Sequence, residues 1–129
     1  MAFERAWLRV LAVLLFAYAG ASLVHHVHNA EFLADYPNMP AWITRPAVYA
    51  AWVGETLLGG VGYLLLRRGY LAFGLWVIAV YAALGFDTFA HYALAPAGAH
   101  TSAMNATIWL EAAAAALVFV AVLVLARRR

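Results

Sequence analysis

Four long apolar stretches, separated by short polar segments, run along the chain. Each is about as long as the ~20 mostly apolar residues that a helix needs to cross a bilayer. We expect membrane-spanning helices at about residues 7–32, 43–66, 70–92 and 104–126. The segments between them are too short to separate two domains. The sequence therefore predicts an all-α, polytopic four-helix membrane bundle in which residues 1–129 form a single transmembrane domain.

The segments between the stretches carry residues that end helices. Pro37 and Pro40 fall in the first segment, Arg67-Arg68-Gly69 forms the second, and Pro96 lies in the third. Proline and glycine are the strongest local breaks in a helical pattern. The first stretch also begins with basic residues, as a signal peptide does. Its far end holds His25-His26-Val27-His28-Asn29 instead of a small-residue cleavage site, so we expect it to be retained.

Composition supports a membrane location. Hydrophobic residues make up 67% of the chain and charged residues only 11%, whereas a typical soluble domain has about 25% charged residues. A soluble fold of this size removes only roughly two-thirds of its chain's surface from water, which is too little to hide so much apolar surface. The absence of cysteine excludes disulfides, iron–sulfur clusters and thiolate metal sites. No phosphate-binding loop, serine-nucleophile elbow or nucleic-acid-binding motif is present.

The basic residues are all arginine, and they are distributed unequally between the two ends of the predicted bundle. Only Arg45 lies at one end. The arginines at the other end are Arg5, Arg9, Arg67, Arg68, Arg127, Arg128 and Arg129. Basic residues favour the cytoplasmic side of a membrane, so both termini are predicted to face the cytoplasm. We expect a multi-pass protein of a bacterial inner (plasma) membrane, with its two longer loops toward the periplasm or cell exterior.

Ionisable residues gather in the outward half of the predicted spans. Such residues are costly in a membrane, usually face the bundle interior, and mark functional sites. Imidazoles and carboxylates come from all four spans: His25, His28, Glu31, Glu55, Asp87, His91 and Glu111. Random scatter of polar residues would not concentrate them at one depth.

Spacing places several of these residues on shared helix faces. Residues three or four positions apart are neighbours on a helix, which brings His28 near Glu31 and Asp87 near His91. His26 is rotated by about 100° from its neighbour His25, so it points to a different side of the helix. We therefore expect His26 at the surface, together with His100 in the last loop.

The pattern predicts a transition-metal site. Nitrogen and oxygen ligands without sulfur suit copper, iron or zinc, whereas calcium and magnesium prefer oxygen. The predicted ligands are His25, His28, Glu31, Asp87 and His91. Glu55 and Glu111 are predicted to act as catalytic bases or to orient the imidazoles. An open coordination position would allow redox or hydrolytic chemistry on a lipid-soluble substrate, and a closed one would serve metal storage, sensing or delivery.

Two resemblances bear on this site. Asp87-x-x-x-His91 followed by His100 resembles the Asp-x-x-x-His…His copper motif in the C subunit of membrane methane and ammonia monooxygenases, where the second histidine follows at a longer interval. His28-Asn29-Ala30-Glu31 followed by Tyr36-Pro37 is similar to the small bacterial membrane proteins named for an HXXEE motif, with Phe32 in place of the second glutamate. The second likeness covers about a third of the chain. It implies a four-helix membrane fold and a role for His28 and Glu31, but no reaction.

Three other classes of function remain open on the sequence alone. The first is metal-free acid–base catalysis on a lipid-soluble substrate, with Glu55, Glu111 or Asp87 moving protons as carboxylates do in membrane sterol isomerases. The second is proton or ion movement. The nearly apolar cytoplasmic halves of the spans disfavour it, because a path through the membrane needs polar groups in both halves. The third is an accessory subunit of a larger membrane complex or a homo-oligomer, including haem ligation by His25 or His28 with His91.

Overall fold

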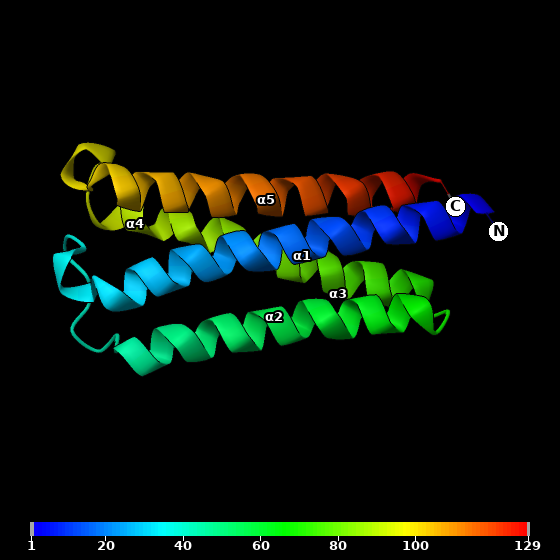
Figure 1. The fold of residues 1–129 in the computed structure, drawn as a ribbon, viewed down its shortest axis with the longest axis horizontal. Coiled ribbons are helices and arrows are strands. Elements are labelled where there is room, and N and C mark those ends of the chain that lie inside the picture. Colours follow the sequence, from blue (N-terminus) through cyan, green and yellow to red (C-terminus); the bar gives the residue numbers. More distant parts are fainter. Residues whose placement is uncertain (1, 129) are drawn as a thin grey trace.

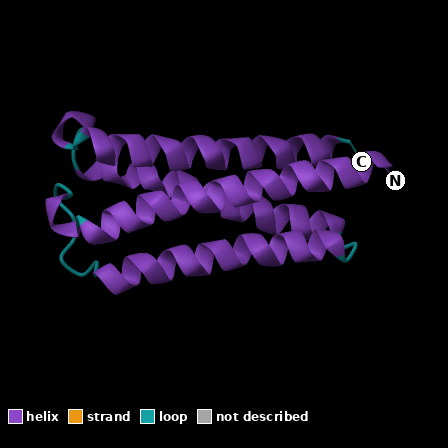
Figure 2. Ribbon diagram, in the orientation of Figure 1, coloured by secondary structure: helices purple, strands orange, loops and turns teal. Residues whose placement is uncertain are grey.

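The computed structural model describes residues 2–128, and within that range every regular element is a helix. The elements are α1 (Ala2–Glu31), η1 (Leu33–Asp35), α2 (Arg45–Arg67), α3 (Leu71–Leu84), η2 (Gly85–Phe89), α4 (Ala90–Leu94), η3 (Ala97–Ala99) and α5 (Ser102–Arg127). They build four spans in the described chain, each long and apolar enough to cross a membrane. Figure 2 shows this helical content at a glance. The predicted all-α four-helix fold is confirmed.

The four spans lie side by side along the long axis of the molecule (Figure 1). Helix α1 packs against α2 and α5, and α3 packs against the same two helices, which closes the bundle. Both termini and the α2–α3 turn lie at one end. The opposite end carries the two longer loops, 32–44 and 95–101. We call this opposite end the histidine end, because the last turns of α1, helix α4 and the last loop bring the histidines of the chain to it.

The turn between α2 and α3 depends on Gly69. This residue has φ of +88°, in the left-handed region that glycine adopts without strain. The Gly69 N–H donates to the Leu66 carbonyl and the Tyr70 N–H donates to the Leu65 carbonyl, both at 3.0 Å. These bonds satisfy carbonyls that the helix end leaves free, in the Schellman arrangement. The helix therefore stops where the Arg-Arg-Gly segment predicted.

Small residues allow α2 and α3 to approach closely, as glycine does in membrane helix pairs. A Cβ atom on Gly59 would lie 2.4 Å from the Tyr81 ring, and one on Gly62 would lie 2.6 Å from the Ile78 side chain. Gly60 differs from its neighbours, because within the described residues nothing lies within 4 Å of the position its Cβ would take.

The third span is interrupted, which corrects the prediction of one continuous helix over 70–92. Helix α3 ends at Leu84, and the 3₁₀ segment η2 precedes the short helix α4. The Tyr18 hydroxyl donates to the Tyr81 carbonyl at 3.1 Å, which is the carbonyl that an uninterrupted α-helix would pair with the Gly85 N–H. The Gly85 N–H bonds to the Ala82 carbonyl instead. A side chain from α1 therefore replaces a backbone donor at the point where the span changes its winding.

Gly85 also lets three helices meet at this break. A Cβ atom there would lie 2.5 Å from both the Tyr18 hydroxyl and the Ala115 Cβ. Tyr18 and Ala115 are themselves fully buried. The break in the third span thus packs against the centre of the bundle. It lies next to the polar residues of the histidine end, on the side nearer the termini.

Candidate functional site

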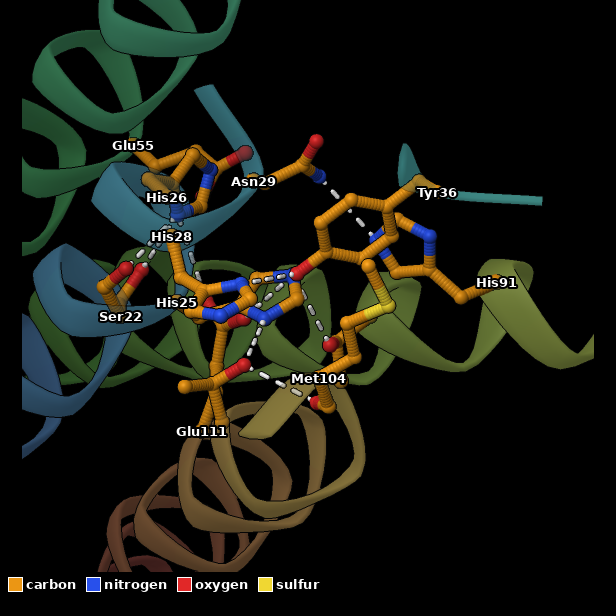
Figure 3. Close-up of polar contacts among 12 residues, drawn as sticks. Ser22, His25, His26, His28, Asn29, Tyr36, Glu55, His91, Met104 and Glu111 are labelled. Carbon is orange, nitrogen blue, oxygen red and sulfur yellow. Dashed lines mark hydrogen bonds and ion pairs between the residues drawn. The ribbon is translucent and has the colours of Figure 1, made fainter. Parts of the chain in front are cut away.

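Two imidazoles and two carboxyl groups face one another inside the histidine end (Figure 3). His25 and His26 come from the last turns of α1, Glu55 from α2 and Glu111 from α5. The His25 and Glu111 residues are only 3% and 2% exposed. We call these four residues the inner cluster. Glu55 and Glu111, predicted as the acid–base residues, therefore lie together with His25 as the sequence suggested.

The tautomer of His25 follows from its hydrogen bonds. The Thr107 hydroxyl lies 3.0 Å from the Met104 carbonyl, and it must donate its proton there because a carbonyl only accepts. The same hydroxyl oxygen lies 3.2 Å from His25 Nδ1, so it accepts from an Nδ1–H. In the neutral imidazole the lone pair is then on Nε2. That atom lies 3.3 Å from the Thr88 hydroxyl and 3.8 Å from Glu111 Oε2.

His26 has the same tautomer for a different reason. Its Nδ1 lies 2.9 Å from the Ser22 carbonyl, which can only accept, so Nδ1 carries the hydrogen. Its Nε2 lone pair then faces Glu55 Oε2 at 4.0 Å, and its Nδ1 lies 3.8 Å from Glu111 Oε1. The prediction that His26 lies at the surface was wrong. The 100° rotation from His25 turns His26 toward α2, and that direction is also inside the bundle because α1 contacts both α2 and α5.

Each Nε2 lone pair of the inner cluster thus faces a carboxyl oxygen across a gap of 3.8–4.0 Å. This is longer than the ~3.2 Å limit of a good N–H···O hydrogen bond. Both atoms of each pair are acceptors in their unprotonated forms, so a proton or a metal ion between them would be bound favourably. Metal–ligand bonds of ~2.1 Å can join two atoms up to ~4.2 Å apart. Across residues 2–128 no three His, Asp or Glu side chains form a ready-made metal site.

A second group of polar residues lies nearer the loops. His28 Nδ1 lies 3.0 Å from the Tyr36 hydroxyl, and the Tyr36 ring packs against the His91 ring with centroids 4.8 Å apart. The Asn29 side-chain amide donates to His91 Nε2 at 3.1 Å. We call His28, Asn29, Tyr36, His91 and His100 the outer cluster. Burial raises the pKa of Tyr36 to about 12, and the Glu111 carboxylate contributes in the same direction.

His100 belongs to this outer cluster, which corrects the prediction that it lies at the surface. It is only 7% exposed, and its ring lies 5.4 Å from the Tyr92 ring and 6.2 Å from the His91 ring. Its Nδ1–H donates to the Pro96 carbonyl at 3.1 Å. The loop folds back over the bundle, so a residue outside the spans becomes buried.

The structure does not bring the five predicted metal ligands to one point. His25 lies in the inner cluster, whereas His28 and His91 lie in the outer one. Glu31 lies at the exposed end of α1, where it pairs with Arg45 and accepts from the Tyr49 hydroxyl at 2.6 Å. Asp87 lies on the exposed side of η2.

Sequence reasoning missed several residues that orient the imidazoles, namely Ser22, Thr88, Thr107 and Tyr36. Ser22 stands four residues before His26, and that helical spacing was a usable signal. Thr88 and Thr107 lie 63 and 82 residues from His25, so only the packing of the spans shows their role. Tyr36 lies eight residues after His28, beyond the end of the helix, and the path of the loop decides their contact.

Comparison with protein-family models, with curated proteins and with solved structures finds no match for this chain. The resemblance to the HXXEE-motif proteins therefore stays a prediction. The function has to be argued from the site itself, because a helical bundle supports many activities.

Proposed function

We propose that the inner cluster binds one transition metal ion inside the membrane, with copper, iron and zinc as the candidates. The supporting observation is that His25 and His26 each direct an Nε2 lone pair toward a carboxyl oxygen of Glu111 or Glu55. Histidines that bind metals have this pattern, because an acceptor on the other ring nitrogen sets the tautomer and orients the ring. Two nitrogens and two carboxylates without sulfur suit these three metals.

Charge balance supports the same proposal. Two neutral imidazoles and two carboxylates carry a net charge of −2, which is costly inside a membrane. A divalent ion at the inner cluster neutralises that charge and can accept lone pairs from both acceptor pairs. When bound, such an ion can polarise a substrate oxygen or exchange electrons. The surrounding helices expose large apolar side chains such as Phe16 and Leu57, so the substrate we propose is lipid-soluble.

We further propose the orientation that the arginines favour. Arginines flank the bundle end that carries both termini, and Arg45 alone stands at the histidine end. By the positive-inside rule the termini face the cytoplasm of a bacterial inner membrane, and the inner cluster lies in the periplasmic half. Accessibility labelling of a cysteine introduced at Ser102 in intact cells tests this, because labelling only after lysis would contradict it.

The metal is tested by elemental analysis of protein purified in mild detergent without a histidine tag. We expect about one metal ion per chain, and its loss in His26→Gln and in Glu111→Gln. Two matched controls remove the same chemical groups outside the inner cluster, namely His28→Gln and Glu31→Gln. Both controls should keep the metal. No metal in the parent after loading and washing, or equal loss in the controls, would reject the inner cluster as the metal site.

A second candidate function is metal-free acid–base catalysis, because protons can also bridge the same acceptor pairs. It is favoured by the position of Glu55, whose side chain is 22% exposed and adjoins Thr56 in the wall of a cavity. In that case the purified protein has no metal, and its infrared spectrum contains a protonated carboxyl band that Glu111→Gln or Glu55→Gln removes. A metal-free protein without such a band would exclude this candidate.

A further inference from the structure

A cavity of about 200 Å³ lies between α1 and α2, and none of its lining residues belongs to the two histidine clusters, although Glu55 adjoins Thr56 in the sequence. Its apolar wall consists of Ala12, Leu15, Phe16, Ala19, Gly59 and Gly60. Phe16 is 81% exposed, so the cavity borders the lipid-facing surface of the bundle. Thr56, Tyr63 and Tyr81 complete the wall, and Thr56 stands midway along α2 between Arg45 and Arg67. The cavity therefore lies near the middle of the membrane.

Two buried hydroxyl groups belong to this wall. Neither the Thr56 hydroxyl nor the Tyr81 hydroxyl makes a hydrogen bond of normal geometry to any part of the described chain. The two hydroxyls lie close enough for a long hydrogen bond with each other. That bond uses one of their two protons, so the other has no acceptor in the described chain. A buried polar group without a partner costs about 1–3 kcal/mol. A ligand that carries an acceptor into the cavity would remove that cost, since a threonine hydroxyl can be redirected by rotation about one bond.

Bulk phospholipid cannot supply that acceptor. Its ester carbonyls lie at the edge of a hydrocarbon core ~30 Å thick, about 15 Å from the depth of Thr56. Only its hydrocarbon chains reach the middle of the bilayer, and they have no hydrogen-bonding atoms. The partner must therefore be a lipid-soluble molecule that carries its polar group to the membrane interior.

The size of the cavity narrows the class of molecule. An apolar cavity of about 150 Å³ accommodates benzene, so about 200 Å³ suits one substituted six-membered ring. We propose that this cavity binds the ring of a quinone-type carbonyl compound, with a ring carbonyl accepting a hydrogen bond from Thr56 or Tyr81. The apolar tail of the molecule leaves past Phe16 into the lipid. The proposal does not rest on a metal at the inner cluster, because it concerns binding at different residues.

Trp52 provides a built-in reporter. Its indole N–H donates to the Ala19 carbonyl at 3.1 Å, and Ala19 lines the cavity. A quinone bound there would quench the fluorescence of this tryptophan. The difference between the parent and Trp52→Phe isolates its signal from that of the other tryptophans.

Glycines provide one test variant and two matched controls. Gly60 lines the cavity, and Gly20 and Gly54 do not. Within residues 2–128, nothing lies within 4 Å of a Cβ built on any of these three glycines, so the Cβ of a new side chain meets no clash at any of them. Gly60→Leu therefore fills the cavity, whereas Gly20→Leu and Gly54→Leu add the same group elsewhere. Gly59 is unsuitable, because its Cβ would strike the Tyr81 ring.

The experiment is a titration of the protein in phosphatidylcholine nanodiscs with a decyl-substituted benzoquinone, monitored by Trp52 quenching. We expect saturable quenching in the parent and equally in Glu111→Gln, which removes a proposed metal ligand on α5 and leaves the lining of the cavity unchanged. This variant tests the cavity apart from the metal proposal. Gly60→Leu should weaken binding about 10-fold or more, which corresponds to ~1.4 kcal/mol. Gly20→Leu and Gly54→Leu should bind within about 2-fold of the parent, since they leave the contacts unchanged. Of Thr56→Val and Tyr81→Phe, the variant that removes the donor should weaken binding about 5-fold, the effect of one lost hydrogen bond.

Two results would overturn the proposal. The first is unsaturable quenching that rises in proportion to quinone in every variant, which would mean that the cavity holds only bulk acyl chains. The second is saturable binding that Gly60→Leu leaves unchanged, which would place the quinone at another site. Circular dichroism confirms in parallel that each variant remains folded.

Discussion

The Thr107 hydroxyl lies 3.2 Å from His25 Nδ1 and uses its own proton on the Met104 carbonyl at 3.0 Å. This arrangement leaves the hydroxyl oxygen able only to accept from the imidazole. It therefore sets which nitrogen of His25 faces Glu111. A residue of α5 determines the chemistry of a residue of α1, although the two are 82 positions apart.

Thr107→Val tests that relationship, because valine keeps the shape of threonine and removes the acceptor. His25 Nδ1–H then loses its partner, and the ring is free to change tautomer or rotate. We expect metal affinity to fall by about 10–100-fold, the usual effect of removing a group that orients a metal-binding histidine. Competition with a chelator measures this. Thr107→Ser restores the hydroxyl and should restore affinity, and a failure to do so would mean that packing, not the hydrogen bond, is responsible.

Tyr36 should ionise unusually late. Its pKa of about 12 lies above the ordinary value of 10.0 because the side chain is buried. Ultraviolet titration of the parent minus Tyr36→Phe should show an inflection near pH 12. Because the pKa is raised in the folded protein, the stability that this tyrosine contributes is complete below pH 10 and is lost as the pH rises from 10 through 12. An inflection near pH 10 in the difference curve would show that Tyr36 is solvated.

Gly85→Ala should destabilise the fold, since its new methyl group would lie 2.5 Å from the Tyr18 hydroxyl and the Ala115 Cβ. Overpacking of this kind costs typically 1–3 kcal/mol. Gly20→Ala is the matched control, because nothing in the described chain lies within 4 Å of the added carbon. It should leave stability unchanged or raise it by up to ~1 kcal/mol through helix propensity. Unfolding in detergent, followed by circular dichroism, measures both variants. Equal stability of the two would contradict the close contact at Gly85.

Arg45→Gln should loosen the loop over the histidine end without affecting metal binding. The Arg45–Glu31 pair joins the end of α1 to the start of α2 across the 32–44 loop. The pair is exposed, and exposed pairs contribute little to global stability and weaken with salt. We expect faster hydrogen exchange in residues 32–44, with the overall unfolding transition and the metal content nearly unchanged. Loss of metal in Arg45→Gln would instead support the prediction that Glu31 is a ligand.

Part of the candidate site could be predicted from the sequence. His25, Glu55 and Glu111 were expected in one layer together with His28, Glu31, Asp87 and His91, since intramembrane ionisable residues at one depth have few partners other than one another. Glu31 illustrates the limit of that argument. It shares a helix face with His28 by spacing, but a loop brings Arg45 and Tyr49 to it, and helical periodicity contains no information about a loop's path.

The sequence by itself determined the number of spans, their approximate ends and the class of residues in the site. These features depend on local properties, namely the length and apolarity of each stretch and the helix-ending residues between them. Only the tertiary structure decided which ionisable residues meet. His26 is partly buried by a neighbouring helix, and His100 is buried by a returning loop. The third span breaks at Gly85 because the Tyr18 hydroxyl from α1 occupies the Tyr81 carbonyl. Contacts between distant segments decide such outcomes, and a single stretch of sequence does not encode them.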